Sequence, residues 1–253
     1  MKRLLCGFIG VLAICGSAYS MDGELVSLDT SDPLYMAADD HILSTTDIGY
    51  GNDFLRLGQG FEYGVNDRLS MHANTHYQFD FAHNRRERGF SSIELGGVYR
   101  AGLADDNSMG VVSDVLFGIN FGGNHRVSDL GLRKNHKTDE SITDKTKYFA
   151  GVRIGRQWAG VTLSGTVKST WIFDNAKGMA MLDFMPEMYF RMVEGWRFGV
   201  GLTARLSTNP DFDKEWLKFK VLRQFGQTQY AVIYSYEYEE EESSIGMQLN
   251  ILF

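Results

Sequence analysis

The last ten residues of the chain, 244–253, alternate strictly between apolar side chains and small or polar ones. Successive side chains of a β-strand point to opposite faces, so a period of two indicates a strand with one apolar and one polar face. The pattern continues up to an aromatic residue at the last position. The apolar positions are Ile245, Met247, Leu249, Ile251 and Phe253.

This segment resembles the carboxy-terminal assembly signal of Gram-negative outer-membrane β-barrel proteins, which is an alternating final strand that ends on Phe. The resemblance implies an all-β fold, a closed antiparallel up-and-down transmembrane β-barrel, and an integral location in the outer membrane. It also implies that Ile245, Met247, Leu249, Ile251 and Phe253 contact the barrel-assembly machinery, and that outer-membrane lipid and lipopolysaccharide surround the protein. It implies no particular activity.

The first 20 residues have the composition of a secretory signal peptide. Lys2 and Arg3 precede an apolar run, 4–15, and residues 18–20 form a small-residue cleavage site. The apolar run is too short to cross a membrane as a helix. We expect export with cleavage after Ser20. The expected divisions are a signal peptide over 1–20, a periplasmic amino-terminal tail over 21–40, and the barrel over 41–253.

Composition excludes several classes of function. Both cysteines, Cys6 and Cys15, lie in the leader, so the exported chain has no thiol for a disulfide or a metal site. Removing Lys2 and Arg3 leaves 23 basic and 32 acidic residues, a net charge of −9. An acidic chain of this kind does not support nucleic-acid binding. No P-loop, dinucleotide-binding or zinc motif is present, so no cofactor and no metal are expected.

Residues 41–253 divide into about twelve alternating segments, although ten or fourteen strands would also fit the pattern. Short turns and long loops alternate, apart from a longer turn at 101–108, as in transmembrane barrels with short periplasmic turns and long external loops. Aromatic residues gather at the strand ends, where interfacial girdles are expected. The predicted membrane-interface aromatics are Trp158, Trp171, Trp196, Trp216 and Phe253.

Two turn sequences agree with this strand pairing. Gly226-Gln227 begins with glycine and suits a type II′ hairpin. Asn66-Asp67-Arg68 provides an odd, three-residue loop, which keeps the apolar side chains of both flanking strands on one face.

The polar faces of the strands carry charges of both signs, with a cationic excess between Arg153 and Lys220. We interpret them as the wall of a narrow channel that favours anionic or zwitterionic solutes. An interior whose charges are paired across strands is an equal alternative. The predicted lumen-lining or solute-contacting residues are Arg56, Glu62, His72, His76, Glu94, Asp114, Arg153, Lys168, Asp183, Glu187, Arg191, Arg205, Lys218 and Lys220.

Strand register predicts one ion pair inside the barrel. An odd turn between the two strands involved places Asp183 opposite Arg205, or Glu187 diagonal to it, so Arg205 is expected beside a carboxylate. His72 and His76 lie about 13 Å apart on one strand, too far to share a zinc ion, and hydrogen bonding in the lumen is expected instead.

Three functions remain open at this stage. The first is a porin-like channel for small polar or anionic solutes. The second is a non-conducting structural or adhesive barrel that uses its external loops, of which 122–145 is the longest. The third is a lipase-type or protease-type enzyme at the external rim, but no motif joins the available groups, so we expect no enzyme. The external-loop residues expected to contact lipopolysaccharide phosphates are Arg85, Arg86 and Arg88, and the rim candidates for chemistry are Asp80, His83, His125, Asp174 and Ser243.

Overall fold

The structure is a computed structural model, and parts of the chain lie outside its described residues. The signal peptide expected over 1–20, the loop arginines Arg85 and Arg86, and most of the 122–145 loop are among these parts. In the described part of the chain, no helix is long and apolar enough to cross a membrane. The described residues are 30–51, 54–81, 87–103, 109–123, 145–158, 160–173, 178–192, 195–210, 213–238 and 241–253.

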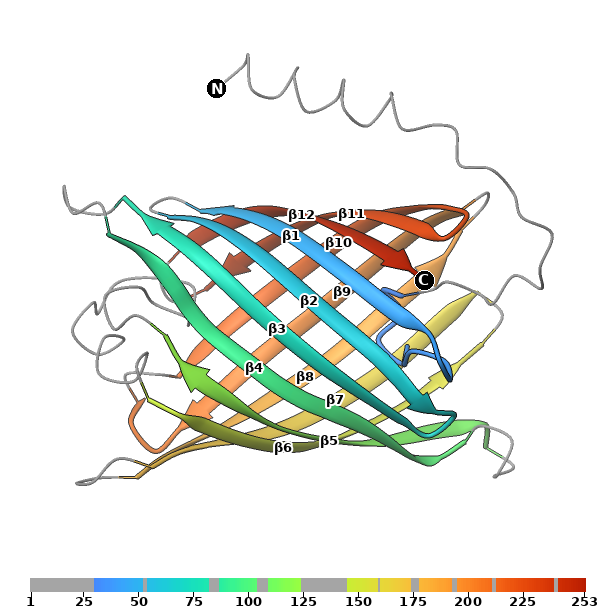
Figure 1. The fold of residues 1–253 in the computed structure, drawn as a ribbon, viewed down its shortest axis with the longest axis horizontal. Helices are drawn as coiled ribbons and strands as arrows, with labels where there is room; N and C mark the ends of the chain where they lie inside the picture. The colour runs from blue at the N-terminus through green and yellow to red at the C-terminus, as the bar shows by residue number, and fades with distance from the viewer. Residues whose placement is uncertain are drawn as a thin grey trace, which may run out of the picture.

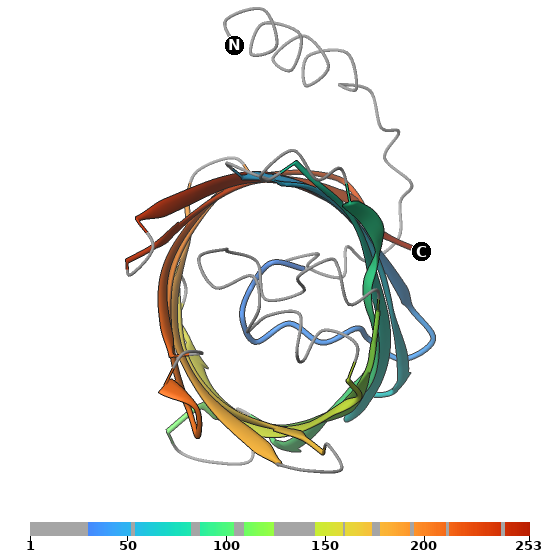
Figure 2. The same ribbon diagram turned by 90° about the vertical axis from the view of Figure 1, so that its left-hand side faces the viewer.

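Twelve antiparallel strands form a closed barrel, as predicted (Figure 1). Each strand pairs with its neighbours in the sequence, and β1 pairs with β12 to complete the ring (Figure 2). The strands are β1 (Ile42–Gly51), β2 (Phe54–Asn66), β3 (Leu69–Asp80), β4 (Glu87–Gly102), β5 (Val111–Gly122), β6 (Lys147–Gln157), β7 (Val161–Ile172), β8 (Met179–Arg191), β9 (Trp196–Ser207), β10 (Lys214–Phe225), β11 (Thr228–Glu237) and β12 (Glu242–Leu252).

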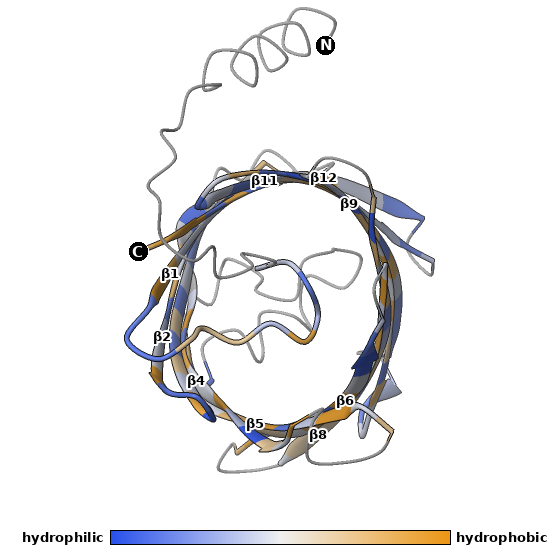
Figure 3. Cartoon of the chain, turned by 90° about the vertical axis from the view of Figure 1, so that its right-hand side faces the viewer, coloured by the Kyte–Doolittle hydropathy of each residue, from blue (hydrophilic) through white to orange (hydrophobic). Residues whose placement is uncertain are grey.

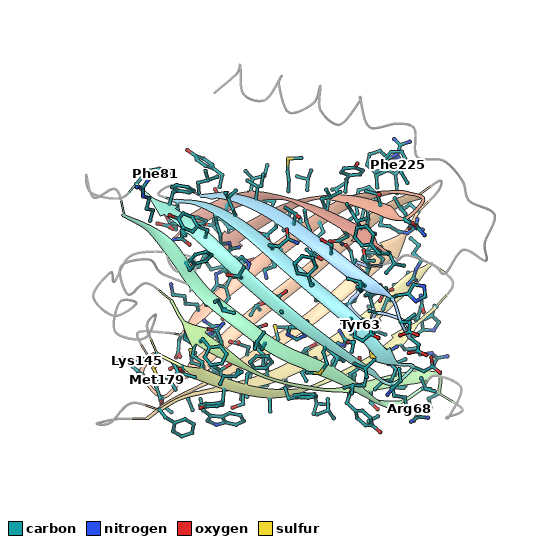
Figure 4. All side chains as sticks on the ribbon, in the orientation of Figure 1. Tyr63, Arg68, Phe81, Lys145, Met179 and Phe225 are labelled. Carbon is teal, nitrogen blue, oxygen red and sulfur yellow. The ribbon has the colours of Figure 1, made fainter. Side chains whose placement is uncertain are left out.

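The outer face of the barrel is apolar and the inner face is largely polar. In β6, Val152 and Ile154 are exposed on the outside, while Phe149 and Gly155 are buried on the inside. Figure 4 shows side chains covering the outside of the barrel from end to end. So large an exposed apolar surface indicates contact with lipid. A closed ring also pairs the backbone N–H and C=O groups of every strand, which lipid requires because it offers no hydrogen-bonding partners.

Most short turns lie at one end of the barrel and most longer connections at the other; the exceptions are 103–110 between β4 and β5, at the first end, and 52–53 between β1 and β2, at the second. Arg68 and Phe225 mark the short-turn end in Figure 4, and Phe81, Lys145 and Met179 mark the opposite end. Phe253 lies beside the start of β1 at the short-turn end, where it exchanges two backbone hydrogen bonds with Ile42, of 2.8 and 3.0 Å. We call the two ends of the barrel the short-turn end and the long-loop end.

The two predicted turns have different outcomes. Gly226 has a positive φ of 55° and Gln227 does not, as a type II′ hairpin requires. The loop after β2 is shorter than predicted, because Asn66 pairs directly with Leu69 and leaves a two-residue turn. The odd residue is absorbed by a bulge between Gly64 and Asn66, which keeps the faces aligned.

Residues 30–38 lie inside the barrel at the short-turn end, and the chain then passes over β2 to reach the start of β1 (Figure 3). We call residues 30–40 the amino-terminal segment. It contacts the wall at β2, β4, β6, β7, β8, β11 and β12. The sequence suggested a tail here, and the described part of that stretch is instead packed against the inner wall. The physical reason is that its carboxylate and carbonyl groups meet arginines on the inner face.

Candidate functional site

The middle of the barrel holds a cluster of cationic side chains drawn from different walls. Lys218 on β10 lies within electrostatic reach of Arg56 on β2, Lys168 on β7 and Lys220 on β10. All four side chains are partly exposed. In the described part of the chain, Arg56, Lys168 and Lys218 have no salt bridge with a carboxylate.

Two carboxylates accompany these cations. Glu187 on β8 lies 3.9 Å from the Nζ atom of Lys220 and also within reach of Lys218. Glu94 on β4 lies 3.4 Å from His72 and within reach of Lys168. With four cations and two carboxylates, these side chains carry a net charge of about +2. We call these six charged residues the mid-lumen cluster.

A glycine on β9 makes room for the cluster. A Cβ atom on Gly201 would lie 3.1 Å from Cγ of Glu187, and one on Gly199 would lie 3.4 Å from Cβ of Lys220. The distance at Gly199 is an ordinary van der Waals contact, whereas the distance at Gly201 is shorter than most real Cβ contacts, so glycine there leaves room for Glu187. This is how a strand between β8 and β10 permits contact between charges on its two neighbours.

Accessibility differs along the barrel. Side chains near the middle keep a substantial exposed fraction: 27% for Lys220, 31% for Glu187 and 31% for His76. Nε2 of His76 lies 3.7 Å from Oδ1 of Asp47. Towards the two ends, the charged side chains are more deeply buried and more fully paired, which distinguishes the ends from the middle.

At the short-turn end, one buried carboxylate holds two arginines. Asp114 on β5 has a fully buried side chain and accepts hydrogen bonds from Nε of Arg100 at 2.9 Å and from Nε of Arg153 at 2.8 Å. The two guanidinium groups then donate to the amino-terminal segment, Arg100 to the carbonyl of Leu34 at 2.6 Å and Arg153 to the carbonyl of Tyr35 at 3.4 Å. Asp114 and Arg153 were predicted as lumen residues, and both are committed to this network.

Arg191 at the same end is also occupied. It forms an ion pair with Asp32 of the amino-terminal segment and donates to Thr162 Oγ1 at 2.9 Å. Glu62 accepts from the backbone N–H of Ala37 at 2.9 Å. Burial, together with the negative charge of Glu62, raises the pKa of Tyr35, so the tyrosine hydroxyl stays neutral.

At the long-loop end, the predicted ion pair between Arg205 and Asp183 is confirmed. The two residues are directly opposite in the β8–β9 register, and Nε of Arg205 donates to Oδ1 of Asp183 at 2.6 Å. Lys214 and Glu237 form a second buried pair at 3.5 Å. At this end, the interior charges therefore pair across strands, as in the second interpretation of the polar faces.

Trp216 differs from its expected position at the membrane interface. It stands at the same strand face as Lys214 and Lys218, and its ring lies 5.1 Å from the Arg205 guanidinium. It was assigned to the interface as an aromatic residue near a strand end, although its even position places it on the inward face of Lys214 and Lys218.

The other predicted interface aromatics, Trp158, Trp171, Trp196 and Phe253, are exposed. Arg156 lies over the Trp158 ring at 5.1 Å, and Arg223 lies over Trp196 at 5.0 Å, both on the outer side. Arg88 is exposed on β4.

Metal-ligating side chains do not gather in the described residues. No group of three or more His, Asp or Glu side chains there could hold a metal ion. The rim candidates His83, His125 and Asp174 lie outside the described residues, so the enzyme hypothesis keeps no observed catalytic pair.

Sequence reasoning missed the role of the amino-terminal segment, including Asp32. A signal was present: Leu34, Tyr35 and Met36 follow Pro33 directly, and consecutive apolar residues are unusual in a solvated tail. Thr162 was also missed, because a threonine on an inward face has no distinguishing pattern.

Comparison with protein-family models and with curated proteins gives no match. Solved structures of the same fold exist. An outer membrane channel from Pseudomonas putida F1 matches with a TM-score of 0.61 and 9% identity, covering 93% of this chain and 100% of that one. The KdgM porin in complex with disordered oligogalacturonate matches at 0.60 and 6%, covering 83% and 98%. The NanC porin matches at 0.58 and 10%, with the same coverage.

These identities are too low to carry more than architecture. The chain therefore has the fold of outer-membrane β-barrel porins, and its site must be interpreted from its own residues.

Proposed function

We propose that this chain is an outer-membrane channel of the porin type that passes small anionic solutes. The observation that carries the proposal is the mid-lumen cluster, in which four cations from β2, β7 and β10 accompany two carboxylates. An excess of positive charge between low-dielectric walls raises the local concentration of anions. The cations remain partly exposed, so a passing solute can meet them.

A solved barrel of the same fold supports the proposal that the solute is acidic. A solved structure of the KdgM porin is a complex with disordered oligogalacturonate, an acidic oligosaccharide. Sugars with carboxylate groups would suit Lys168, Lys218 and Lys220, because ammonium groups on flexible stems follow a moving anion without demanding fixed geometry.

The membrane setting belongs to the same proposal. The protein would be exported with cleavage after Ser20, inserted by the barrel-assembly machinery through its last strand, and surrounded by outer-membrane lipid. The short-turn end would face the periplasm. Arg88, with Arg85 and Arg86, would contact lipopolysaccharide phosphates.

The test is the reversal potential of the refolded protein, lacking residues 1–20, in a planar bilayer with a salt gradient. We expect chloride to be more permeant than potassium. One charge at about 7 Å in water contributes about 0.6 kcal/mol, or about threefold in anion concentration. Lys218→Gln and Lys220→Gln should each lower the chloride preference by about that factor.

Arg156→Gln is the matched control, because Arg156 is a strand arginine on the outer face. It should leave selectivity unchanged. Equal selectivity in the wild type, the two lysine variants and this control would contradict the assignment of the mid-lumen cluster.

A non-conducting structural or adhesive barrel is the second candidate, and one observation favours it: the amino-terminal segment occupies the short-turn end. A folded barrel that passes no current, with and without residues 30–38, would support this candidate and contradict the channel.

A further inference from the structure

The amino-terminal segment is attached to the wall mainly through polar groups. Thr30 and Ser31 each donate to Oε1 of Gln229 at 2.7 Å, and Asn250 donates to Thr30 at 2.8 Å. Its apolar contacts include Leu34, packed against Gly155, and Tyr35, packed against Leu43 and Leu252. Polar contacts of this kind can be exchanged for contacts with water or a polar solute at small net cost.

Asp32 is the most strongly held residue of the segment. Its Oδ2 atom accepts a hydrogen bond from Thr162 Oγ1 at 2.6 Å and pairs with Arg191, while Oδ1 accepts from the backbone N–H of Leu34 at 2.8 Å. The Asp32 side chain is 7% exposed and Thr162 is fully buried. Arg191 and Thr162 thus together bind one carboxylate, that of Asp32.

Arg191 is positioned independently of Asp32. Its guanidinium also donates to the carbonyl of Trp158 at 3.4 Å and lies 5.7 Å from the ring of Tyr189. Thr162 and Tyr189 are paired residues on β7 and β8, so the strand register holds both sides of the site together. The site would therefore persist if Asp32 left it.

The segment has a fixed point at its carboxy-terminal side. Asp40 adopts a positive φ of 57°, donates through its backbone N–H to Gly64 at 3.0 Å, and accepts from the Tyr63 hydroxyl at 2.8 Å. A Cβ atom on Gly64 would overlap the backbone oxygen of Ala38, so the segment crosses β2 only because glycine stands there. Movement of residues 30–38 about this point would clear the short-turn end.

We propose that Arg191 and Thr162 form a carboxylate-binding site in the short-turn mouth, that Asp32 of the same chain occupies it, and that a carboxylate-bearing solute displaces the segment by competing for it. This inference rests on the proposed channel function. Such a solute opens the channel only because it binds the displaced state, where the site is vacant, and not the closed state.

The test uses the refolded protein lacking residues 1–20 in planar bilayers, with galacturonate as the probe and uncharged galactose as its control. In the wild type, galacturonate on the short-turn side should raise the open fraction, and galactose should not. Asp32→Asn removes one partner of a buried ion pair, so the closed-to-open ratio should fall about a hundredfold and the response to galacturonate should disappear.

Asp39→Asn is the matched control, because Asp39 is an exposed carboxylate of the same segment. It should behave as the wild type. Arg191→Gln should abolish the response to galacturonate, because it removes the cationic half of the site. Gly64→Ala should raise the open fraction, because the added methyl group displaces the amino-terminal segment at Ala38. This variant replaces Asp32→Asn in the test if Asp32→Asn fails to fold.

The possible results separate this inference from the proposed function. If the wild type conducts, but neither galacturonate nor Asp32→Asn nor Gly64→Ala changes the open fraction, the carboxylate site is refuted and the channel stands. If folded barrels of the wild type and of a variant lacking residues 30–38 both pass no current, the channel itself is refuted, and the displaceable segment with it.

Discussion

Replacement of Asp114 by asparagine should strongly destabilise the barrel. The Asp114 carboxylate is fully buried and holds Arg100 and Arg153, whose own side chains are only 16% and 14% exposed. Asparagine keeps the shape but removes the negative charge. Two buried guanidinium groups would then face each other without compensation.

The magnitude follows from the burial of all three groups. Removing one partner of a buried ion pair costs about 3–5 kcal/mol, because an uncompensated charge remains away from water. Asparagine can still accept one hydrogen bond, but two arginines lose their partner, so we expect a loss of about 4 kcal/mol. Arg100 and Arg153 also hold the carbonyls of Leu34 and Tyr35, so the amino-terminal segment should loosen in the same variant.

The assay is equilibrium unfolding in urea of the barrel refolded into lipid vesicles, followed by tryptophan fluorescence. Asp47→Asn is the matched control, because Asp47 is also an inward aspartate but is 27% exposed and lies 3.7 Å from His76. It should cost less than about 1 kcal/mol. Equal unfolding midpoints and slopes for Asp114→Asn, Asp47→Asn and the wild type would refute the reasoning.

Three further outcomes are expected. Gly226→Ala should lower the free energy of unfolding by about 1 kcal/mol because Gly226 has a positive φ, whereas Gly165→Ala, at a site with no atom within 4 Å, should not; urea unfolding compares them. In single-tryptophan variants, lipids brominated along their acyl chains should quench Trp171 and Trp196 but not Trp216, whose quenching would contradict its inward position. Phe253→Ala should reduce the heat-modifiable folded fraction in cells, because it removes the exposed terminal aromatic side chain of the alternating strand and leaves the backbone bonds to Ile42 in place; unchanged assembly would remove that role from the side chain.

Much of the architecture could be predicted because its pattern is local. Alternation with a period of two assigns each residue to a face without reference to any other strand, which is why the terminal strand and the closed twelve-stranded barrel were predicted correctly. Turn chemistry added register, and register was enough to place Arg205 beside Asp183. Trp216 was assigned to the interface from its place near a strand end, although alternation places it on the same inward face as Lys218.

The mid-lumen cluster was only partly predictable. The sequence pattern assigned Arg56, Lys168, Lys218 and Lys220 to the inner face, but it could not indicate which inward charges would meet. Those distances depend on the tilt and stagger of the closed ring, which brings β2, β7 and β10 to face one another. Closure also decides which cations are taken up by buried carboxylates and which remain accessible.

By itself, the sequence determined the all-β class, the apolar outer face and the polar inner face, because each follows from neighbours one or two positions apart. That residues 30–38 lie within the barrel, and that Asp32 occupies the site of Arg191 and Thr162, depended on contacts between distant parts of the chain. Asn250 contacts Thr30 from 220 positions away, and Thr162 contacts Asp32 from 130. No local periodicity records such contacts, since they arise only when the ring has closed around the segment.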